Sequence, residues 1–548
     1  MARPVRRRFV GLAGTTLVLA VVAVVVLVGG GSRAAFAHAS LESSAPAANS
    51  VLEAGPDSIV LDFNEGVEAE LASISLFDGD GSVLQVGTPK AGGDDTIVSV
   101  AAPQVGDGIY AVVWRVTSSD GHVVDGAFSF QVGTGGTGDG QQLIDQVRDG
   151  VRSQPAVRWW YGAARFLSLA GAIALLGAGW WLLQAPALML ARRGAKVLIA
   201  VAAVALGVGS AAAFGLFGAE AVAGTLADAA SPSVWADVAG TQTGRMLLAR
   251  VVFAVVLVGL LGLRARRAWG WWRLAAAAAG IFTLYTFPAA GHPNGQDPAA
   301  LWITLDLAHL VAITIWLGGL LALAVSSSAA LASPEGGRLV RRFSMASAIA
   351  VPVIVASGVA QALKLAGGIA DLTETDWGRL LLTKVTVVVA LLALAGVSRW
   401  LLRHDGTASI RRTVIAEAML GVVVVGLAAG MVALPPRPQV EARPFAQQLS
   451  SQGLIAVISL SPGVVGSNEM HIVMTPPGGS ITPVVNATAR VSLASALIPA
   501  SPVTLTREGP NHYSGLITFP RGGDWTFELI VQLTETQSIL FTSTVPIP

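Results

Sequence analysis

The sequence contains no cysteine among its 548 residues. This absence excludes disulfide bonds, thiolate metal ligands, iron–sulfur clusters and cysteine nucleophiles. Charged residues are scarce, at 13% of the chain, and they nearly cancel to a formal net charge of +1. No bulk electrostatic field therefore favours nucleic acid as a partner. A P-loop, a nucleophile elbow and a zincin motif are also missing, so we do not expect an enzyme.

What the chain has in abundance is apolar residues, at 53% of the total. Between residues 159 and 434 they form eight stretches of the length needed to cross a hydrocarbon core, roughly 20 residues each. The stretches are 159–184, 197–219, 245–263, 272–290, 301–327, 344–366, 379–400 and 413–434. We therefore predict a bundle of eight transmembrane helices in a lipid bilayer.

The N-terminus has the pattern of an exported protein. Four arginines lie within the first eight residues, an apolar run follows over 10–28, and Ala35-Phe36-Ala37 precedes His38. This order predicts a signal peptide over residues 1–37, although the long apolar run leaves an uncleaved anchor as an alternative. Cleavage after Ala37 would leave His38 as the first residue, with a free α-amine beside its imidazole.

The loops between the apolar stretches predict the orientation. The even-numbered loops, 220–243, 291–300 and 367–378, contain no Lys or Arg and carry carboxylates instead. The basic residues gather in the odd-numbered loops, as Arg192, Arg193, Lys196, Arg264, Arg266, Arg267, Arg273, Arg338, Arg341, Arg342, Arg399, Arg403, Arg411 and Arg412. Because basic loops stay in the cytoplasm, both chain ends are expected outside the cell membrane of a multi-pass protein.

Both flanking regions have strand-like patterns. Residues 38–132 alternate apolar and polar positions between Gly, Pro and Asp turns, which predicts an all-β sandwich or barrel. Residues 133–158 form a linker that ends in a short polar helix over 141–157. The region 435–548 again alternates and predicts a second, smaller β-sandwich.

One group of residues in the first β-domain could hold a metal ion. Asp120 and His122 are two positions apart, so in an extended segment both side chains point to the same face, and Gly121 lets the backbone approach. With the amine and imidazole of His38 they form a nitrogen-rich set that suits Cu(II). By spacing alone, before His38 is considered, an exposed turn histidine is the favoured interpretation of His122.

The first domain resembles the CopC family of periplasmic copper-binding proteins. The resemblance rests on four segments: His38-Ala-Ser-Leu-Glu-Ser-Ser-Ala-Pro46, Val60-Leu-Asp-Phe-Asn-Glu65, Gly108-Ile-Tyr-Ala-Val-Val-Trp-Arg-Val116, and Ser118-Ser-Asp-Gly-His122 with Gly126-Ala-Phe-Ser-Phe130. It implies that His38, Asp120 and His122 ligate Cu(II), with Glu65 just behind them. No methionine lies between Met1 and Met189, so thioether ligands for Cu(I) are missing and we expect selectivity for Cu(II).

The apolar region resembles the CopD copper-resistance family, whose fusions to CopC are implicated in copper uptake. The matching segments are Gly291-His292, Asp306-Leu-Ala-His309 with Trp316-Leu-Gly-Gly319, Arg342-Phe343-Ser344, Thr375–Lys384, and Arg411-Arg412 leading to Glu417. The C-terminal region resembles YtkA-like domains through Ser461–Asn468 and Gly522-Gly-Asp-Trp525.

Ionisable residues inside the apolar stretches mark candidate pathways or internal pairs. Asp306 and His309 are three apart on one helical face, and His292 lies just outside the preceding span, so the three could receive copper. The alternative is that Asp306 and His309 pair with each other or with Arg250. We expect the remaining membrane charges to be structural or interfacial, namely Glu417, Lys384, Arg165 and Lys364.

In the last domain, Met470, His471 and Met474 invite a copper interpretation. In a strand, however, the two methionines share a face and His471 points away. We therefore expect core methionines beside an exposed histidine.

These observations favour a protein that captures Cu(II) outside the membrane and imports it, with the copper ion, the bilayer and extracytoplasmic copper proteins as partners. Two alternatives stay open. One is a haem-binding or redox membrane protein with His292 and His309 as axial ligands. The other is a delivery or assembly factor that does not transport copper.

Overall fold

A computed structural model of the chain describes residues 39–48, 50–119, 121–133, 140–148, 154–184, 193–264, 271–296, 298–327, 330–331, 333–366, 371–404, 410–432, 434, 445–461, 463–475 and 484–547. Two compact units are present. One holds the helices of Ser153–Pro438, and the other holds the strands of His38–Arg152 and Gln439–Pro548. The predicted leader, His38 and Asp120 lie outside the described residues.

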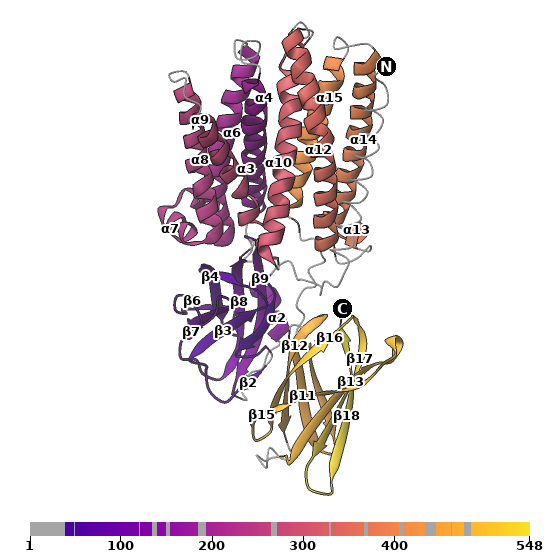
Figure 1. Cartoon of the computed structure of the whole chain (residues 1–548). Helices are drawn as coiled ribbons and strands as arrows, with labels where there is room; N and C mark the ends of the chain where they lie inside the picture. Colours follow the sequence, from indigo (N-terminus) through magenta and orange to yellow (C-terminus); the bar gives the residue numbers. More distant parts are fainter. Residues whose placement is uncertain are drawn as a thin grey trace. The chain divides into compact units, whose positions relative to one another are not determined.

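The first β-domain consists of two sheets of mostly antiparallel strands around one core, which confirms the predicted sandwich (Figure 1). Its strands are β1 Leu41–Ala45, β2 Val51–Leu52, β3 Ser58–Phe63, β4 Val67–Phe77, β5 Val83–Leu84, β6 Lys90–Ala91, β7 Ile97–Ala101, β8 Gly108–Ser118 and β9 Val123–Val132. The sheets have the orders β1-β3-β7-β6 and β2-β9-β8-β4-β5. Alternation places Ile59, Leu61 and Phe63 of β3 in the core, where Phe63 meets Trp114 edge to face.

Apolar residues also lie on the outer face of the second sheet, where a helix covers them. The helix α2, Gly140–Arg148, falls within the predicted linker and begins where the short polar helix was expected. Its Leu143, Ile144 and Val147 pack on Phe77 and Val113. The linker is therefore partly integrated into the first domain.

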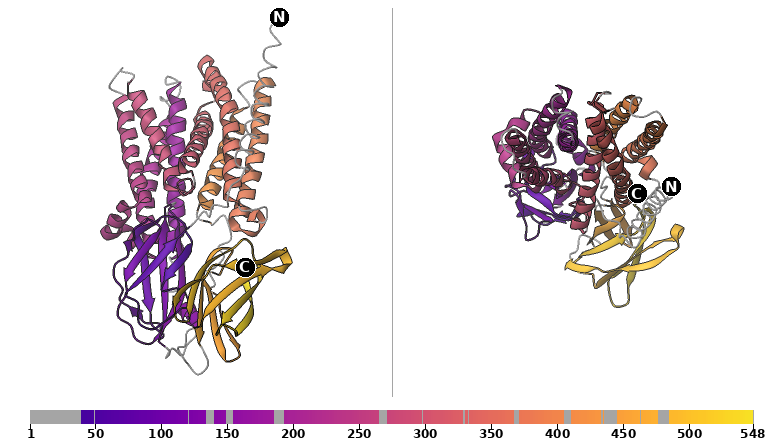
Figure 2. Two further views of the ribbon diagram at one scale, coloured as in Figure 1. Left: turned by 60° about the horizontal axis from the view of Figure 1, so that its bottom comes forward. Right: turned by 45° about the horizontal axis from the view of Figure 1, so that its top comes forward.

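The middle of the chain folds as a helical bundle (Figures 1 and 2). Its long helices are α3 Pro155–Ala172, continued through the π-helix Ile173–Ala178 and α4 Gly179–Leu183, then α6 Arg193–Ala221, α8 Gln242–Arg264, α10 Ala299–Ala324, α12 Pro334–Leu365, α14 Asp376–His404 and α15 Ile410–Met431. Seven helices in the described part of the chain are long and apolar enough to span a membrane. They correspond to seven of the eight predicted spans, and the protein is a multi-pass membrane protein.

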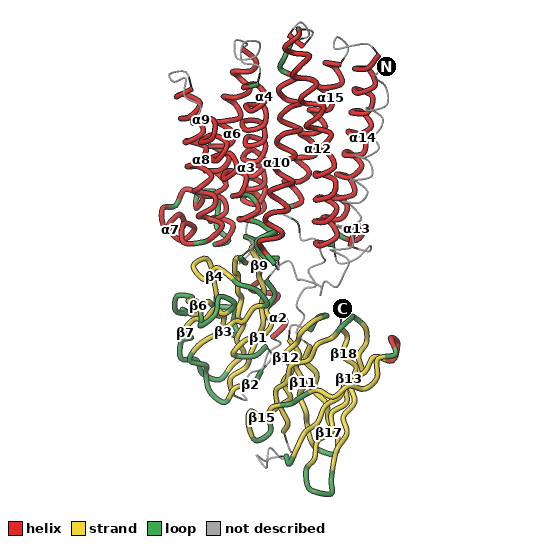
Figure 3. Tube along the Cα trace, viewed as in Figure 1, coloured by secondary structure: helices red, strands yellow, loops and turns green. Residues whose placement is uncertain are grey.

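The remaining predicted span, 272–290, which is the fourth in chain order, corresponds to a shorter helix. This helix, α9, covers Trp271–Tyr285 and has 15 residues, followed by a 3₁₀ turn at Pro288–Ala290. It packs beside α8, where the rings of Phe253 and Phe282 stack with centroids 5.6 Å apart. Shorter helices that the hydropathy did not predict are α7 Pro232–Gly240 and α13 Asp371–Glu374 (Figure 3).

Small residues allow two helical segments to touch backbone to backbone inside the bundle. A Cβ atom added at Gly318 of α10 would lie 2.3 Å from the Cα atom of Gly177 in the π-helical turn. A Cβ atom at Gly177 would lie 2.0 Å from the carbonyl oxygen of Thr314. Membrane helices, which gain little from the hydrophobic effect, are held together by such close van der Waals contact.

We therefore expect Gly318→Val to destabilise the bundle by about 1 to 3 kcal/mol or more, because neither backbone can move aside without opening the contact. Thermal unfolding of purified protein in detergent measures the change. Gly396→Val on α14 is the matched control, since a Cβ atom there meets nothing within 4 Å. An unchanged unfolding temperature in Gly318→Val would contradict the importance of this contact.

The C-terminal region contains the predicted strands, arranged as two sheets around one core. They are β10 Phe445–Ser451, β11 Leu454–Ser461, β12 Gly466–Thr475, β13 Asn486–Leu493, β14 Ile498–Val503, β15 Thr506–Gly509, β16 His512–Phe519, β17 Gly523–Gln532 and β18 Ser538–Ile547. The sheet orders are β10-β11-β12-β16-β15 and β14-β13-β17-β18. Trp525 and Phe519 pack edge to face in the core between them.

Candidate metal sites

Three chain segments meet at one end of the first β-domain. The N-terminal segment is held to the turn after β3, because the amide of Ser40 donates to Oδ1 of Asn64 at 2.7 Å and the amide of Asn64 donates to the Ser40 carbonyl at 3.1 Å. The β8–β9 turn is held to the same place, since the amide of Ser119 donates to the carbonyl of Gly66 at 2.9 Å. The backbone thus brings together the segments that carry the predicted ligands.

The predicted ligands are distributed over these three segments. His122 and Glu65 are described and half-buried; Glu65 is adjacent to Asn64 and Gly66, and His122 is three residues after Ser119, the residues whose hydrogen bonds join the segments. The β8–β9 turn is tight: the Ser118 amide donates to the His122 carbonyl at 2.8 Å, and Gly121 has φ +82°. Only glycine adopts that conformation without strain, which explains the Asp-Gly-His order. His38 adjoins the described N-terminal segment, and Asp120 adjoins Gly121.

A second group of polar residues lies inside the helical bundle, between α10 and α12. Nδ1 of His309 lies 2.8 Å from Oγ of Ser357, whose hydroxyl also donates to the carbonyl of Val353. Asp306 lies three residues earlier on α10, and Gln361 lies four residues after Ser357 on α12. The two helices run antiparallel here. The position one turn before His309 on α10 is Asp306, and the position one turn after Ser357 on α12 is Gln361, so the two pairs lie at successive levels of the bundle.

Lys384 of α14 completes this membrane cluster. Its ammonium interacts electrostatically with both the Asp306 carboxyl and the His309 ring. Lys384 lies within an apolar stretch, where an ionisable group at membrane depth needs a partner. We predicted a structural or snorkelling role for it, and its electrostatic interaction with the Asp306 carboxyl fits the structural role.

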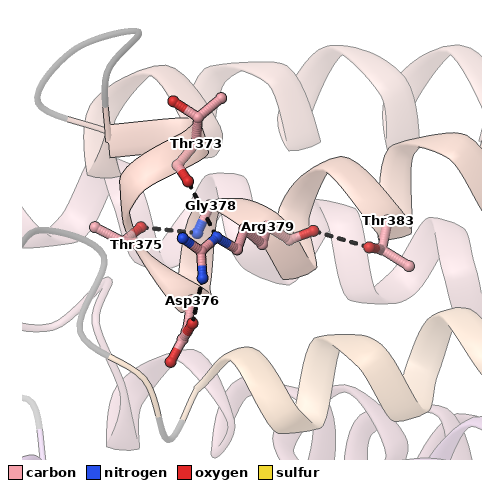
Figure 4. Close-up of polar contacts among 6 residues, drawn as sticks. All are labelled: Thr373, Thr375, Asp376, Gly378, Arg379 and Thr383. Carbon is pink, nitrogen blue, oxygen red and sulfur yellow. Dashed lines mark hydrogen bonds and ion pairs between the residues drawn. The ribbon is translucent and has the colours of Figure 1, made fainter.

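The start of α14 is fixed by a capping network (Figure 4). Thr375 caps the helix by accepting a hydrogen bond from the Gly378 amide at 2.9 Å. Arg379 donates to the Thr373 carbonyl at 3.0 Å and pairs with Asp376 at 3.3 Å. These contacts hold the helix end, and with it the position of Lys384 farther along.

His292 and Arg250 have different surroundings. His292 lies in the turn between α9 and α10, which is attached to the beginning of α8 because Gln242 donates to Oδ1 of Asn294 at 3.0 Å. Arg250 contacts the residues that follow α9. Its guanidinium donates to Thr286 at 2.9 Å and stacks over Phe287 at 3.6 Å.

The C-terminal domain corrects one prediction. Met470 and Met474 are buried in the core, as expected. His471 is not the exposed histidine we predicted, because its side chain is only 11% exposed and Nδ1 lies 2.9 Å from Nε2 of His512. The pairing was missed because the two histidines are 41 residues apart and meet only through the register of β12 and β16.

Family models match the first β-domain and the helical region of the chain. The CopC domain model matches residues 41–133, the model for the N-terminal domain of copper resistance protein D-like proteins matches 155–300, and the copper resistance protein D model matches 337–431. Copper resistance protein C of Escherichia coli is 34% identical over 114 residues, which cover 19% of this chain and 90% of that protein. The chain belongs to the CopC/CopD copper-resistance family.

One relative of this CopC/CopD chain spans most of it. Copper transport protein CutJ of Bacillus subtilis (strain 168) is 27% identical over 481 residues, which cover 82% of the chain and 83% of that protein. Among solved structures, CopC from Methylosinus trichosporium OB3b is 33% identical, covering 19% of this chain and 98% of its own, with a TM-score of 0.17.

Some of the candidate residues lie inside the ranges that the CopC and CopD models match, and others lie outside them. Glu65, Asp120 and His122 lie inside the CopC match, whose first residue comes three after His38. The membrane histidine His309 lies between the two matches to the CopD halves, whereas Lys384 lies inside the second. The proposed pathway thus joins residues that the separate family models do not cover together.

Proposed function

We propose that this protein captures Cu(II) outside the cell membrane through His38, Asp120 and His122 and passes copper inward through its helical bundle. Glu65 would orient or neutralise the site without ligating. The convergence of the N-terminal segment, the Asn64–Gly66 turn and the Ser118–His122 turn supports the capture site. An amine, two imidazoles and a carboxylate form a ligand set that suits tetragonal Cu(II), the highest of the divalent ions in affinity order.

The proposed topology follows from the charges of the loops. Eight spans, with α9 as the fourth, leave both β-regions on one side of the membrane, and the absence of Lys and Arg from the even loops assigns that side to the exterior. We propose the corresponding division into a leader over 1–37, a CopC-like domain over 38–132, a linker over 133–158, the CopD-like bundle over 159–434 and a YtkA-like domain over 435–548. In this orientation the capture site of the first domain lies outside the membrane, and the turn that carries His292 is on the same side.

The proposed membrane pathway begins at His292 and continues to Asp306 and His309. Asp306 lies seven residues into α10, roughly 10 Å below the helix start, so copper would move from the turn into the bundle. The ammonium of Lys384 balances the Asp306 charge when no ion is present, and an arriving cation would compete with it. Lys384 is thus proposed to neutralise the buried carboxylate of Asp306 while no copper ion is bound.

The experiment that tests this function is copper accumulation in cells that express the chain, compared with cells that carry an empty vector. Import predicts several-fold more cytoplasmic copper at limiting external Cu(II). Unchanged cytoplasmic copper would contradict import and favour a delivery factor. A Soret band in the purified protein would instead favour haem ligation by His292 and His309.

A further inference from the structure

The C-terminal domain contains a chain of three ionisable side chains that the proposed function does not use. Nε2 of His471 lies 3.1 Å from Oε1 of Glu469, and Nδ1 of the same ring lies 2.9 Å from Nε2 of His512. The ring centroids of the two histidines are 5.2 Å apart. A carboxylate, a first imidazole and a second imidazole therefore lie in one line of contacts.

The strand register explains how this chain forms. On β12, Met470, Ile472 and Met474 enter the core, so His471 lies on the opposite face. In the antiparallel pairing His471 is opposite Ser514 and Val473 is opposite His512. The two histidines are thus diagonal neighbours on the non-core face, where long side chains on adjacent strands can meet.

Glu469 lies beside the far nitrogen of His471. Its carboxylate oxygen Oε1 is 3.1 Å from Nε2, so its negative charge favours a proton on that nitrogen and leaves Nδ1 as the nitrogen that faces His512. A carboxylate behind a histidine in this way is the usual arrangement around metal-bound imidazoles, where it fixes the tautomer and raises the basicity of the ligand.

The separation of the two facing nitrogens suits one metal ion. Two ring nitrogens bound at about 2.0 to 2.1 Å and at right angles to each other lie roughly 2.9 Å apart. The observed 2.9 Å therefore equals the spacing of neighbouring ligands on a tetragonal ion, and binding requires each ring to turn its lone pair from the other ring toward the ion. One of the two facing nitrogens carries a proton in the hydrogen bond. When the ion binds, this proton moves to the other nitrogen of its own ring, so that both facing nitrogens offer lone pairs.

The surroundings favour a neutral ligand pair. Burial, reinforced by the neighbouring His471, lowers the pKa of His512, so that the ring is neutral at physiological pH. Glu508 lies on the same face, where it accepts a hydrogen bond from Ser514 at 2.8 Å, and its charge compensates part of an incoming cation. Within the described residues no group of three or more His, Asp or Glu side chains is arranged to hold a metal ion, so water must supply the other ligands.

We propose that His471 and His512 form a second Cu(II) site, completed by water and oriented by Glu469. It has fewer protein ligands than the site proposed for the first β-domain, so it binds copper more weakly. Such a site would hold a second cupric ion on the same polypeptide. The inference does not depend on import or on the ligands of the first domain.

The test counts Cu(II) ions bound to the purified full chain by equilibrium dialysis and records their paramagnetic resonance spectra. His512→Ala and His471→Ala are each expected to bind one ion fewer than the unaltered protein and to lose a spectrum with two coupled nitrogens. Glu469→Gln keeps the ion but binds it roughly 10- to 100-fold more weakly. Thr518→Ala, an exposed position farther along the same face of β16, is the matched control and keeps the full number. An unchanged number of ions in His512→Ala would overturn the second site.

Two further measurements keep the outcome clear. His122→Ala tests the first domain separately: it should lose a different ion, and the double variant with His512→Ala should lose both. In the unaltered chain, Cu(II) should slow the ethoxyformylation of His471 and His512, followed by mass spectrometry. If copper does not protect these rings, the proposal is wrong even if both alanine variants misfold.

Discussion

His122→Ala is expected to weaken Cu(II) binding by the first β-domain by about 100-fold or more, equivalent to about 2.7 kcal/mol. Loss of an outer-shell partner alone costs 10- to 100-fold in metal affinity, so loss of a ligating imidazole should reach at least the upper end of that range. The measurement is competition with a chromophoric Cu(II) chelator, using the full chain.

Two variants sharpen this test. Ser119→Ala lies in the same turn and retains the backbone donor to Gly66, so its affinity should stay unchanged. One extra residue placed before His38 should weaken binding as strongly as His122→Ala, because it separates the α-amine from the imidazole. Full affinity in both altered chains, or a mature protein that still carries residues 1–37, would refute the assigned ligands.

His309→Ala is expected to reduce copper accumulation in expressing cells to the level of cells without the protein. The substitution removes the imidazole of His309, which is the one imidazole in the described cluster between α10 and α12. The carboxylate of Asp306 then remains with Lys384 as its partner and without a nitrogen ligand beside it. Metal analysis of washed cells, normalised to the amount of protein in the membrane, measures the effect.

The controls for the membrane variant separate chemistry from packing. Thr304→Val lies on an exposed part of the same helix and should accumulate copper normally. Ser357→Ala keeps the ring of His309 but removes its 2.8 Å partner, so an intermediate loss is expected. Equal accumulation in His309→Ala and the unaltered protein would show that this residue is not part of a copper pathway.

The order of elements could be predicted from the sequence because the signals involved are local. Hydropathy located α6 to within four residues at each end, since lipid-facing residues must be apolar wherever they lie. It placed the start of α12 ten residues too late, at 344 instead of Pro334. Hydropathy detects the lipid-crossing part of a helix, whereas the capping hydroxyl of Ser333 begins the helix in a polar segment.

By itself, the sequence determined the family, the membrane-crossing character and the residue types that could bind copper, because these depend on composition, short motifs and spacing. Only the tertiary structure decided which distant groups meet. The electrostatic interaction of Lys384 with Asp306 depends on how α14 packs, and the contact of His471 with His512 depends on the register of β12 against β16. A shift of one residue in that register would turn one histidine to the other face, and no local signal encodes such a choice.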